Sequence, residues 1–339
     1  MNEMTGKNGR LTETICREFG CKKILVIGDL MVDEYIVGNV SRLSPEAPIP
    51  VLDSKKCSME AGGASNVAHN LNSLGAEVLV AGTAADDEAG GWLRRHFMQL
   101  QIGTEGIIAE CGRPTTVKTR YATKSQQLLR VDEEDTRSIL EATQEKLFRY
   151  VEKNMEAMDA VVLSDYQKGV LENGIFVQRI IRMCQKYRVL VAVDSKSRRI
   201  RRFAGASFIK PNNLELEAAV NIRIVDDGSF EQAGRMYLKE SGAEVLLVTR
   251  GSKGISVFWP GKARQDYPAR DAQVYDVCGA GDTVISTVTL ALVCGLSMGE
   301  AVRLANIAAG ISISRTGTVV VTSEELMRSV YESEDCCIG

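Results

Sequence analysis

Asp276-Val277-Cys278-Gly279-Ala280-Gly281-Asp282-Thr283 is the stretch of this sequence that decides the fold, and an apolar run from Val284 to Val293 follows it. The run is long enough for about three helical turns, so residues 279–282 should form the first turn of a helix. Free N–H groups and the positive end of the helix dipole would then face an anion. The small residues would let a phosphate approach the backbone closely.

Asp282 adds a carboxylate beside this anion hole, which we assign to Gly279, Ala280 and Gly281. A carboxylate repels phosphate, but it is a sensible proton acceptor for a hydroxyl held between it and the phosphate. The pattern therefore indicates phosphoryl transfer; the alternative is a plain turn before a helix. A dinucleotide fingerprint is excluded because Val284 stands where a third small residue is needed, and the sequence contains no P-loop motif.

Composition narrows the classes of function. The 339 residues are 45% hydrophobic and 25% charged, which suits one large α/β domain or two small ones. A net charge of −3 gives no reason to expect nucleic acid or an acidic membrane surface as a partner.

Nine cysteines without a C-x-x-C pair indicate reduced thiols in the cytoplasm, and two histidines argue against a histidine-based metal centre. No apolar run reaches the about 20 residues of a membrane span. The N-terminus lacks a signal core, so we expect it to remain attached.

The order of apolar runs predicts an α/β body. Buried strands are expected at 24–27, 78–81, 160–163, 189–193, 206–209 and 245–248, with helical sequence between most of them. Open sheets of this kind bind ligands at the carboxyl ends of their strands. Candidate ligand-site residues at that edge are Asp29, Asp33, Asp165 and Asp194. The alternative is that some of these carboxylates only cap turns.

Two segments differ from this rhythm and predict a small β-lid. Residues 34–60 contain Pro45, Pro48 and Pro50, which exclude a helix, and residues 112–131 alternate in the manner of strands. We expect one domain over residues 21–335 that carries this lid, preceded by an N-terminal extension over residues 1–20. The extension should hold a short amphipathic helix with Leu11, Ile15 and Phe19 on one face. The acidic run 132–135 is expected to be a solvated loop.

Two polar positions near predicted helix starts suit ligand binding. Gly62 and Gly63 precede a helix, and Asn66 could exchange hydrogen bonds with sugar hydroxyls. A tight turn with a surface asparagine is the alternative. Asn212 could cap another helix, with Glu215 in its first turn. Glu215 suits both a capping box and a contact to a magnesium-bound water near phosphates.

Four separated motifs occur in a fixed order: Gly62-Gly63-x-x-Asn66, Asn212-x-x-Glu215, Thr249-x-Gly251-x-x-Gly254 and Asp276–Asp282. Together they resemble the PfkB/ribokinase family of carbohydrate kinases over about residues 21–331. The resemblance implies a ribokinase-like three-layer α/β fold with a mostly parallel central sheet, helices on both faces and a small β-sheet lid. It also implies an enzyme that uses ATP and Mg²⁺ to phosphorylate a sugar hydroxyl. A monovalent cation near Asp276 stays open, and we expect Asp276 to shape the loop.

The same resemblance implies roles for individual residues. Asp282 would be the general base. The nucleotide would be bound by Asn212, Glu215, Thr249, Gly251, Gly254 and Asn306, with Glu215 also holding magnesium through a water. For the acceptor sugar the resemblance implies Asp33 and Asn66. The strand ends, the glycine turn and the lid cations add Asp29, Gly62, Gly63, Arg120, Arg130 and Asp165 as expected substrate-binding residues.

Further stretches look like the kinase half of bacterial ADP-heptose synthesis proteins, namely Gly28–Asp33, Ser41–Pro48, Gln126–Arg130 and Leu163–Tyr166. That likeness implies phosphorylation of D-glycero-β-D-manno-heptose 7-phosphate at O1. Bifunctional members carry a C-terminal nucleotidyltransferase, for which this chain is too short, so a separate partner enzyme or another sugar phosphate stays open. The alternatives are a kinase for another sugar or nucleoside, and a non-catalytic sugar- or nucleotide-binding module. Lids of this type often pair, so we expect a homodimer.

Two further expectations concern the surroundings of the site. The lid cations Arg42, Lys118, Arg120, Lys124 and Arg130 predict an acceptor that already carries a phosphate, because a guanidinium can grip a phosphate in two places. The alternative is that these charges are solvated. Cys278 is expected beside the nucleotide, where the helix field would favour a reactive thiolate, and the alternative is a buried inert thiol.

Overall fold

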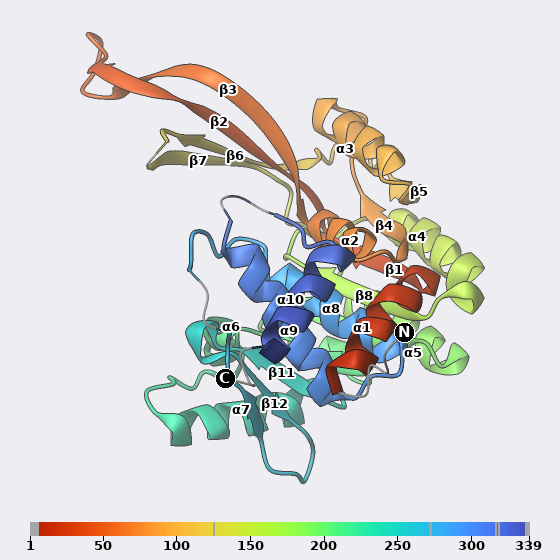
Figure 1. The fold of residues 1–339 in the computed structure, drawn as a ribbon. Coiled ribbons are helices and arrows are strands. Elements are labelled where there is room, and N and C mark those ends of the chain that lie inside the picture. Colours follow the sequence, from red (N-terminus) through yellow and green to blue (C-terminus); the bar gives the residue numbers. More distant parts are fainter. Residues whose placement is uncertain (1–6, 125, 271–272, 316, 318, 336–339) are drawn as a thin grey trace.

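A nine-stranded sheet forms the centre of the body in this computed structural model, which describes residues 7–124, 126–270, 273–315, 317 and 319–335 (Figure 1). Its strand order is β13-β12-β11-β10-β9-β8-β1-β4-β5. The strands from β11 through β5 pair in parallel. At one edge, β12 pairs antiparallel with β11, and β13 pairs antiparallel with β12. The predicted mostly parallel sheet is confirmed.

The strands of the body are β1 (Lys23–Gly28), β4 (Glu77–Thr83), β5 (Gly103–Ile108), β8 (Ala160–Asp165), β9 (Leu190–Ser195), β10 (Phe208–Ile209), β11 (Leu246–Thr249), β12 (Ile255–Phe258) and β13 (Gln265–Tyr267). The helices are α1 (Lys7–Arg17), α2 (Ala64–Ser73), α3 (Glu88–Gln99), α4 (Glu141–Asn154), α5 (Gly174–Tyr187), α6 (Asn213–Val220), α7 (Asp227–Ser241), α8 (Ala280–Val293), α9 (Met298–Ile313) and α10 (Ser323–Asp335). Short 3₁₀ turns are η1 (Phe19–Cys21), η2 (Met155–Ala157), η3 (Ile200–Phe203) and η4 (Gly251–Lys253).

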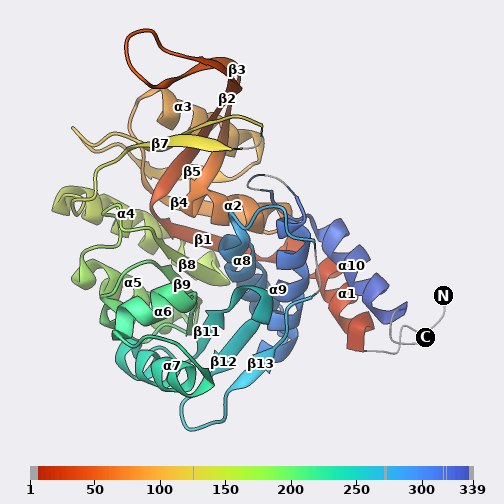
Figure 2. The ribbon, with the colours of Figure 1, turned by 90° about the vertical axis from the view of Figure 1, so that its left-hand side faces the viewer.

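Helices cover both faces of this sheet, which explains why its central strands are continuous apolar runs (Figure 2). One core cluster joins the sheet to α1, α2, α3, α8, α9 and α10, and the other joins it to α4, α5, α6 and α7. Leu11, Ile15 and Phe19 are buried in the first cluster, so the apolar face expected in the N-terminal segment packs onto the body. The described part of the chain contains no helix that is long and apolar enough to cross a membrane.

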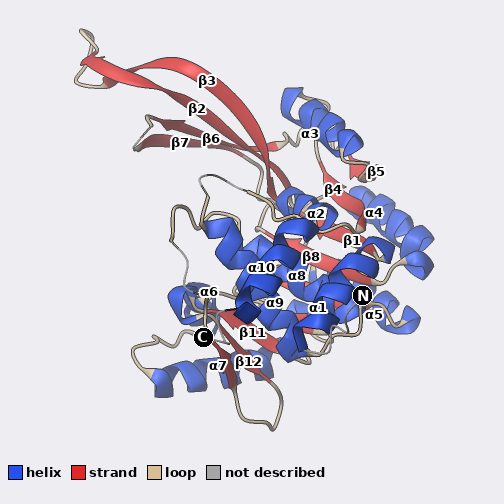
Figure 3. Ribbon diagram, in the orientation of Figure 1, coloured by secondary structure: helices blue, strands red, loops and turns tan. Residues whose placement is uncertain are grey.

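A second, four-stranded sheet projects from the body as the lid (Figure 3). Its order is β3-β2-β6-β7, from β2 (Leu30–Leu43), β3 (Pro50–Gly63), β6 (Thr116–Ala122) and β7 (Gln127–Glu133). These strands include most of residues 34–60 and 112–131, but β2 begins earlier and β3 continues to the start of α2. Asp33 and Gly62 consequently lie at the base of the lid, next to the body.

Three helix starts at the carboxyl edge have the local chemistry that the sequence indicates. Gly279 precedes α8 with φ = 77°, a left-handed conformation that favours glycine, and Gly63 precedes α2 with φ = 55°. At α6 the predicted capping box is present. Asn212 Oδ1 accepts a bond of 2.9 Å from the N–H of Glu215, and Glu215 Oε2 accepts one of 2.8 Å from the N–H of Asn212.

Candidate active site

Asp282 lies in the first turn of α8 and is only 5% exposed. Its Oδ2 accepts a hydrogen bond of 2.7 Å from Asn66 Nδ2, and its Oδ1 accepts one of 2.7 Å from the hydroxyl of Tyr166. Burial and, after it, the charge of Asp194 raise the pKa of Asp282 to about 6, although both donors and Lys196 act in the opposite direction. A carboxylate with a pKa near neutrality is suited to take up a proton from a hydroxyl.

Two cavities meet at this carboxylate. The sheet-edge cavity, of about 520 Å³, lies along the carboxyl ends of β9 to β11 and the start of α8. The lid cavity, of about 240 Å³, lies between the base of the lid and the same helix start. Both are lined by Tyr166, Gly279 and Asp282. A ligand in either cavity would therefore contact the same carboxylate.

The sheet-edge cavity contains most of the residues expected to bind a nucleotide. Its lining includes Asn212, Thr249, Gly251, Gly254, Asn306, Gly279, Ala280 and Gly281. Glu215 does not line this cavity. Asn306 Nδ2 donates to the carbonyls of Tyr267 and Pro268, so this asparagine also fastens the segment after β13.

The start of α8 has the properties of an anion hole. Within the described ranges, the N–H groups of Gly279 and Gly281 donate to no protein acceptor. Lys210 lies beside them, because a Cβ added to Gly281 would be 3.3 Å from Lys210 Nζ. Unpaired N–H groups at a helix N-terminus next to an ammonium group form a favourable site for a phosphate.

Two ion pairs, one partly exposed and one buried, flank this helix start. Lys196 Nζ donates to Glu215 Oε1 at 2.6 Å, and although burial acts against its charge, Asp194, Glu215 and Asp282 raise the pKa of Lys196. Lys210 Nζ lies 3.1 Å from Asp194 Oδ2, and both side chains are buried. The two groups form an ion pair, but neither oxygen of Asp194 accepts a hydrogen bond from any described residue. The site thus holds two ammonium groups and two carboxylates close to the expected phosphates.

A magnesium ion would have to rely on few protein ligands here. Within the described residues, no group of three or more His, Cys, Asp or Glu side chains could hold a metal ion. Magnesium, however, commonly keeps several waters and binds through one or two carboxylates plus substrate phosphates. The unsatisfied buried oxygens of Asp194 fit such an ion, and Glu215 could reach it through a water.

The lid cavity is lined by Met31, Asp33, Gly62, Gly63, Asn66, Lys118, Arg120, Arg130 and Cys278 together with the shared residues. Asp33 pairs with Arg120 across the neighbouring strands β2 and β6. A Cβ at Gly62 would lie 2.5 Å from Asp33 Oδ2, so this glycine is needed for the position of the carboxylate. Arg42 and Lys124 do not line the lid cavity.

The expectation of a solvated acidic loop at residues 132–135 is only partly right: Asp132 and Glu133 are exposed, but they belong to the end of β7, and two of the four carboxylates pair with cations of the lid cavity. Asp132 accepts from Lys118 at 2.6 Å and from Arg130 at 2.8 Å, and Glu134 accepts from Lys118 at 3.0 Å and from Lys168 at 2.7 Å. These carboxylates lie next to the cations because β7 pairs with β6. They therefore neutralise the basic side chains of the lid cavity when no ligand is bound.

Asp29 and Asp165, which we expected at the ligand edge, line neither cavity. The carboxylate of Asp29 accepts from the backbone N–H groups of Tyr166, Lys168 and Val170, and burial followed by the charge of Asp165 raises its pKa to about 6. Asp165 accepts from the Ser195 hydroxyl and pairs with Arg202. Both carboxylates are at the predicted edge, but they fix the loop after β8 instead of facing a ligand.

Three side chains at the site were not singled out from the sequence, namely Tyr166, Lys196 and Lys210. Each follows the last residue of a parallel strand, β8, β9 or β10. The rule that open sheets bind ligands at that edge could have identified all three if it had been applied to every polar residue after a strand.

Cys278 differs from its prediction in place and in ionisation. It lines the lid cavity and not the sheet-edge cavity. Burial and the neighbouring Asp276 raise the pKa of the Cys278 thiol, because both disfavour a thiolate. Asp276 accepts from the N–H groups of Cys278 and Gly317, so it shapes the loop as expected.

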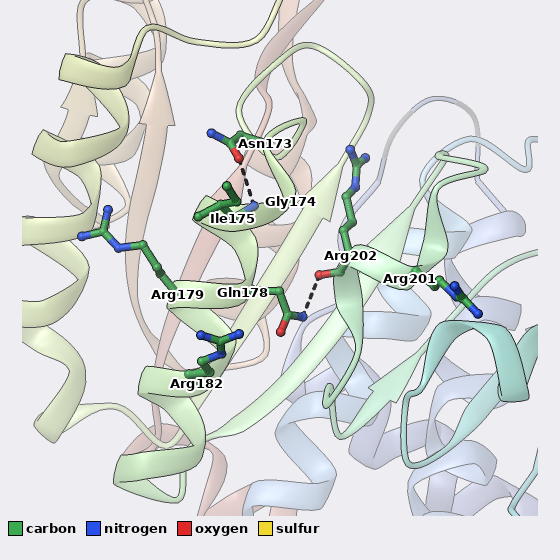
Figure 4. A pocket seen from close by; sticks show the side chains of 8 residues that line it. All are labelled: Asn173, Gly174, Ile175, Gln178, Arg179, Arg182, Arg201 and Arg202. Atoms are coloured by element: carbon green, nitrogen blue, oxygen red, sulfur yellow. Dashed lines mark hydrogen bonds between the residues drawn. The ribbon is translucent and has the colours of Figure 1, made fainter.

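Another hollow lies between α5 and η3, well separated in sequence from Asp282 (Figure 4). It is lined by Arg179, Arg182, Arg201 and Arg202, whose guanidinium groups point away from one another in Figure 4. Arg179 pairs with Glu145, and Arg202 is buried in pairs with Asp165 and Glu172. The residues that line this hollow offer no converging set of groups.

The chain is similar to known sequences over most of its length. The chain is 40% identical over 314 residues to the protein named Bifunctional protein HldE of Desulfatibacillum aliphaticivorans, a match that covers 93% of this chain and 64% of the relative. It is 41% identical over 305 residues to the protein of the same name from Syntrophotalea carbinolica, covering 90% of this chain and 62% of the relative. The chain thus spans somewhat less than two thirds of these relatives.

Solved structures share the fold. Ribokinase of Arabidopsis thaliana, complexed with ribose and ATP, superposes with a TM-score of 0.73 at 19% identity and covers 91% of this chain and 98% of its own. Phosphofructokinase-2 of Escherichia coli, in complex with potassium, gives a TM-score of 0.73 at 17% identity and covers 92% and 99%. Residues 22–325 also match the pfkB carbohydrate kinases as a family. The chain therefore belongs to the pfkB family of carbohydrate kinases.

Proposed function

We propose that this protein transfers the γ-phosphate of ATP to a hydroxyl of a sugar phosphate, directly and in line, without a phosphoenzyme. The observation that carries the proposal is the meeting of two cavities at one buried carboxylate. ATP would occupy the sheet-edge cavity, with its γ-phosphate at the N–H groups of Gly279 and Gly281. The acceptor would occupy the lid cavity, with its hydroxyl toward Asp282.

Each part of the site has a role in this reaction. Asp282 takes the proton of the attacking hydroxyl, while Lys210 and the backbone of the α8 start stabilise charge on the transferred group. Magnesium would neutralise the phosphates of the nucleotide, held by Asp194 and, through a water, by Glu215.

The acceptor that we propose is D-glycero-β-D-manno-heptose 7-phosphate, phosphorylated at O1 to the 1,7-bisphosphate. The lid cavity supports a phosphorylated acceptor because Lys118, Arg120 and Arg130 line it. A phosphate bound to them would fix the far end of the sugar and direct the other end to Asp282. The likeness to the proteins named Bifunctional protein HldE supports the same substrate class.

The setting of the reaction is also a proposal. We infer a cytoplasmic enzyme that forms a homodimer through its lid, where Leu43, Ile49, Leu129 and Val131 are exposed. The product would then be used by a nucleotidyltransferase, on a separate protein or on a further part of a longer chain.

A coupled assay of ADP release tests the proposal. The purified protein is supplied with Mg·ATP and, in turn, heptose 7-phosphate, unphosphorylated heptose, fructose 6-phosphate, fructose, ribose and adenosine. The highest kcat/KM is expected for heptose 7-phosphate, and unphosphorylated heptose should be a much poorer substrate. Equal use of heptose and its 7-phosphate would refute the phosphate grip, and absence of ADP release with every acceptor would refute the kinase assignment.

A further inference from the structure

We propose that Tyr166 is a positioning residue, which holds the carboxylate of Asp282 in its reactive orientation and links it to the phosphate side of the site. This inference rests on the proposed function, since Asp282 is its base. Tyr166 is among the residues that line both cavities, and its hydroxyl donates to Asp282 Oδ1 at 2.7 Å. It acts through Asp282 and is not proposed to exchange protons with the substrate.

The two oxygens of Asp282 are held from opposite parts of the fold. Tyr166, from the loop after β8, binds Oδ1, and Asn66, from α2, binds Oδ2 at 2.7 Å. With one donor on each oxygen, the carboxylate cannot rotate without losing a hydrogen bond. Each oxygen keeps a further lone pair, so the acceptor hydroxyl can still donate to it.

The orientation of the Asn66 amide is itself fixed by a network. Thr283 Oγ1 donates to Asn70 Oδ1 at 2.9 Å, and Asn70 Nδ2 donates to Asn66 Oδ1 at 3.1 Å. The carbonyl oxygen of Asn66 therefore accepts, and its NH₂ group is directed at Asp282. Asn66, expected to bind sugar hydroxyls, thus has both ends of its amide engaged by protein groups.

Besides the bond from its hydroxyl to Asp282, Tyr166 is held at its backbone and contacted at its ring. Its backbone N–H donates to Asp29 Oδ2 at 2.8 Å, so the buried carboxylate of Asp29 helps to fix the position of Tyr166. The ammonium of Lys196 lies 5.2 Å from the centre of the ring and also binds Glu215. Tyr166 therefore connects the base to the groups expected near magnesium and the phosphates. Burial and the nearby charge of Asp282 raise the pKa of Tyr166 well above 10, so the phenol remains a donor at any working pH.

Loss of the hydroxyl should change the titration of Asp282 in a known direction. The bond from Tyr166 favours the charged carboxylate and lowers its pKa, so its removal should raise that pKa. Other titratable or charged groups face Asp282 from the body and from the lid cavity: Asp194, Lys196, Lys210, Asp33, Lys118, Arg120, Arg130 and Cys278. None of these is altered when tyrosine is replaced by phenylalanine.

The test compares Tyr166→Phe with the wild-type enzyme. We expect kcat to fall roughly tenfold to a hundredfold, as for the loss of a hydrogen bond to a charged group, with KM for both substrates changed less than about threefold. The acidic limb of the pH profile of kcat should move to higher pH. Tyr150→Phe is the matched control, since the Tyr150 hydroxyl is buried without a partner in the described part of the chain and lies away from both cavities.

A second measurement needs no substrate. Carbon-13 NMR of aspartate carboxyls, with Asp282→Asn to assign the signal, gives the pKa of Asp282 directly in both proteins. A higher pKa in Tyr166→Phe supports the inference, and an unchanged pKa together with an unchanged pH profile overturns it. If the wild-type protein phosphorylates none of the acceptors, the proposed function fails, whereas the NMR titration still decides the contact between Tyr166 and Asp282.

Discussion

The lid cavity and the sheet-edge cavity share one carboxylate but are built differently. The sheet-edge cavity is lined by glycine turns, strand ends and the start of α8, together with body side chains such as Lys196, Lys210 and Asn306. The lid cavity is made of charged side chains on neighbouring strands, each already paired with an acid. In the proposed reaction, the sheet-edge cavity would hold the nucleoside triphosphate and the lid cavity would select the acceptor. The difference supports the proposal that nucleotide binding and acceptor choice depend on separate parts of the chain.

Asp282→Asn should have the largest effect because it removes the group that both cavities share. We expect kcat to fall roughly 10²- to 10⁴-fold, the usual scale for a general base, while ATP still binds. Steady-state kinetics and calorimetric titration with ATP measure the two properties. Asp86→Asn, on an exposed residue outside both cavities, is the control. A variant that keeps more than about a tenth of the activity would remove Asp282 from this role.

Arg130→Ala and Arg120→Ala should affect the lid cavity alone. Loss of a charge-assisted bond to a phosphate corresponds to roughly a ten- to a hundredfold rise in KM for the sugar phosphate, with KM for ATP nearly unchanged. Lys124→Ala provides the control, because Lys124 is an exposed lid cation that does not line the cavity. An equal rise of both KM values would show that the two cavities are not separate in function.

The pH dependence of kcat should report on the carboxylate of Asp282, which both cavities share. Since the pKa of Asp282 is raised to about 6, the carboxylate becomes protonated below that pH and loses its ability to accept a proton. Activity should therefore fall about tenfold for each pH unit below 6 and level off above 7. The residual activity of Asp282→Asn should lack this limb. If the limb persisted there, another group, such as the phosphate of the acceptor, would be responsible.

Labelling of Cys278 should give the smallest and most local signal. Its raised pKa predicts slow alkylation at neutral pH, and its place in the lid cavity predicts that the sugar phosphate slows labelling further, by at least about threefold. ATP alone should have little effect. Peptide mass spectrometry can follow the labelling of Cys278 beside that of the other exposed cysteines. Cys16, Cys21, Cys57 and Cys111 line neither cavity, so their labelling should not respond. If ATP protected Cys278 as well as the sugar phosphate does, Cys278 would lie beside the nucleotide, as the sequence predicted.

Most of the sheet-edge cavity could be predicted from the sequence because its determinants are local. A left-handed glycine before α8, a capping box at Asn212 and Glu215, and a glycine turn after Thr249 are each decided within about six residues. The lid cavity was predicted less well. Its cations were recognised, but the acids that pair with them were assigned to a loop, because strand register cannot be seen in one segment alone.

The sequence by itself determined the α/β class and the lid, and it predicted Asp282 and the small residues before it as a site, since patterns of apolar, glycine and capping residues act over short distances. Only the tertiary structure decided which carboxylate lines a cavity. Asp29 and Asp282 are both buried, both have a pKa raised to about 6, and both contact Tyr166, yet one binds its backbone and the other its hydroxyl. Asp282 lies 116 residues from Tyr166 and 216 from Asn66 along the chain. Such partners are chosen by the packing of α2, β8 and α8, because a buried carboxylate must find its donors wherever the fold brings them.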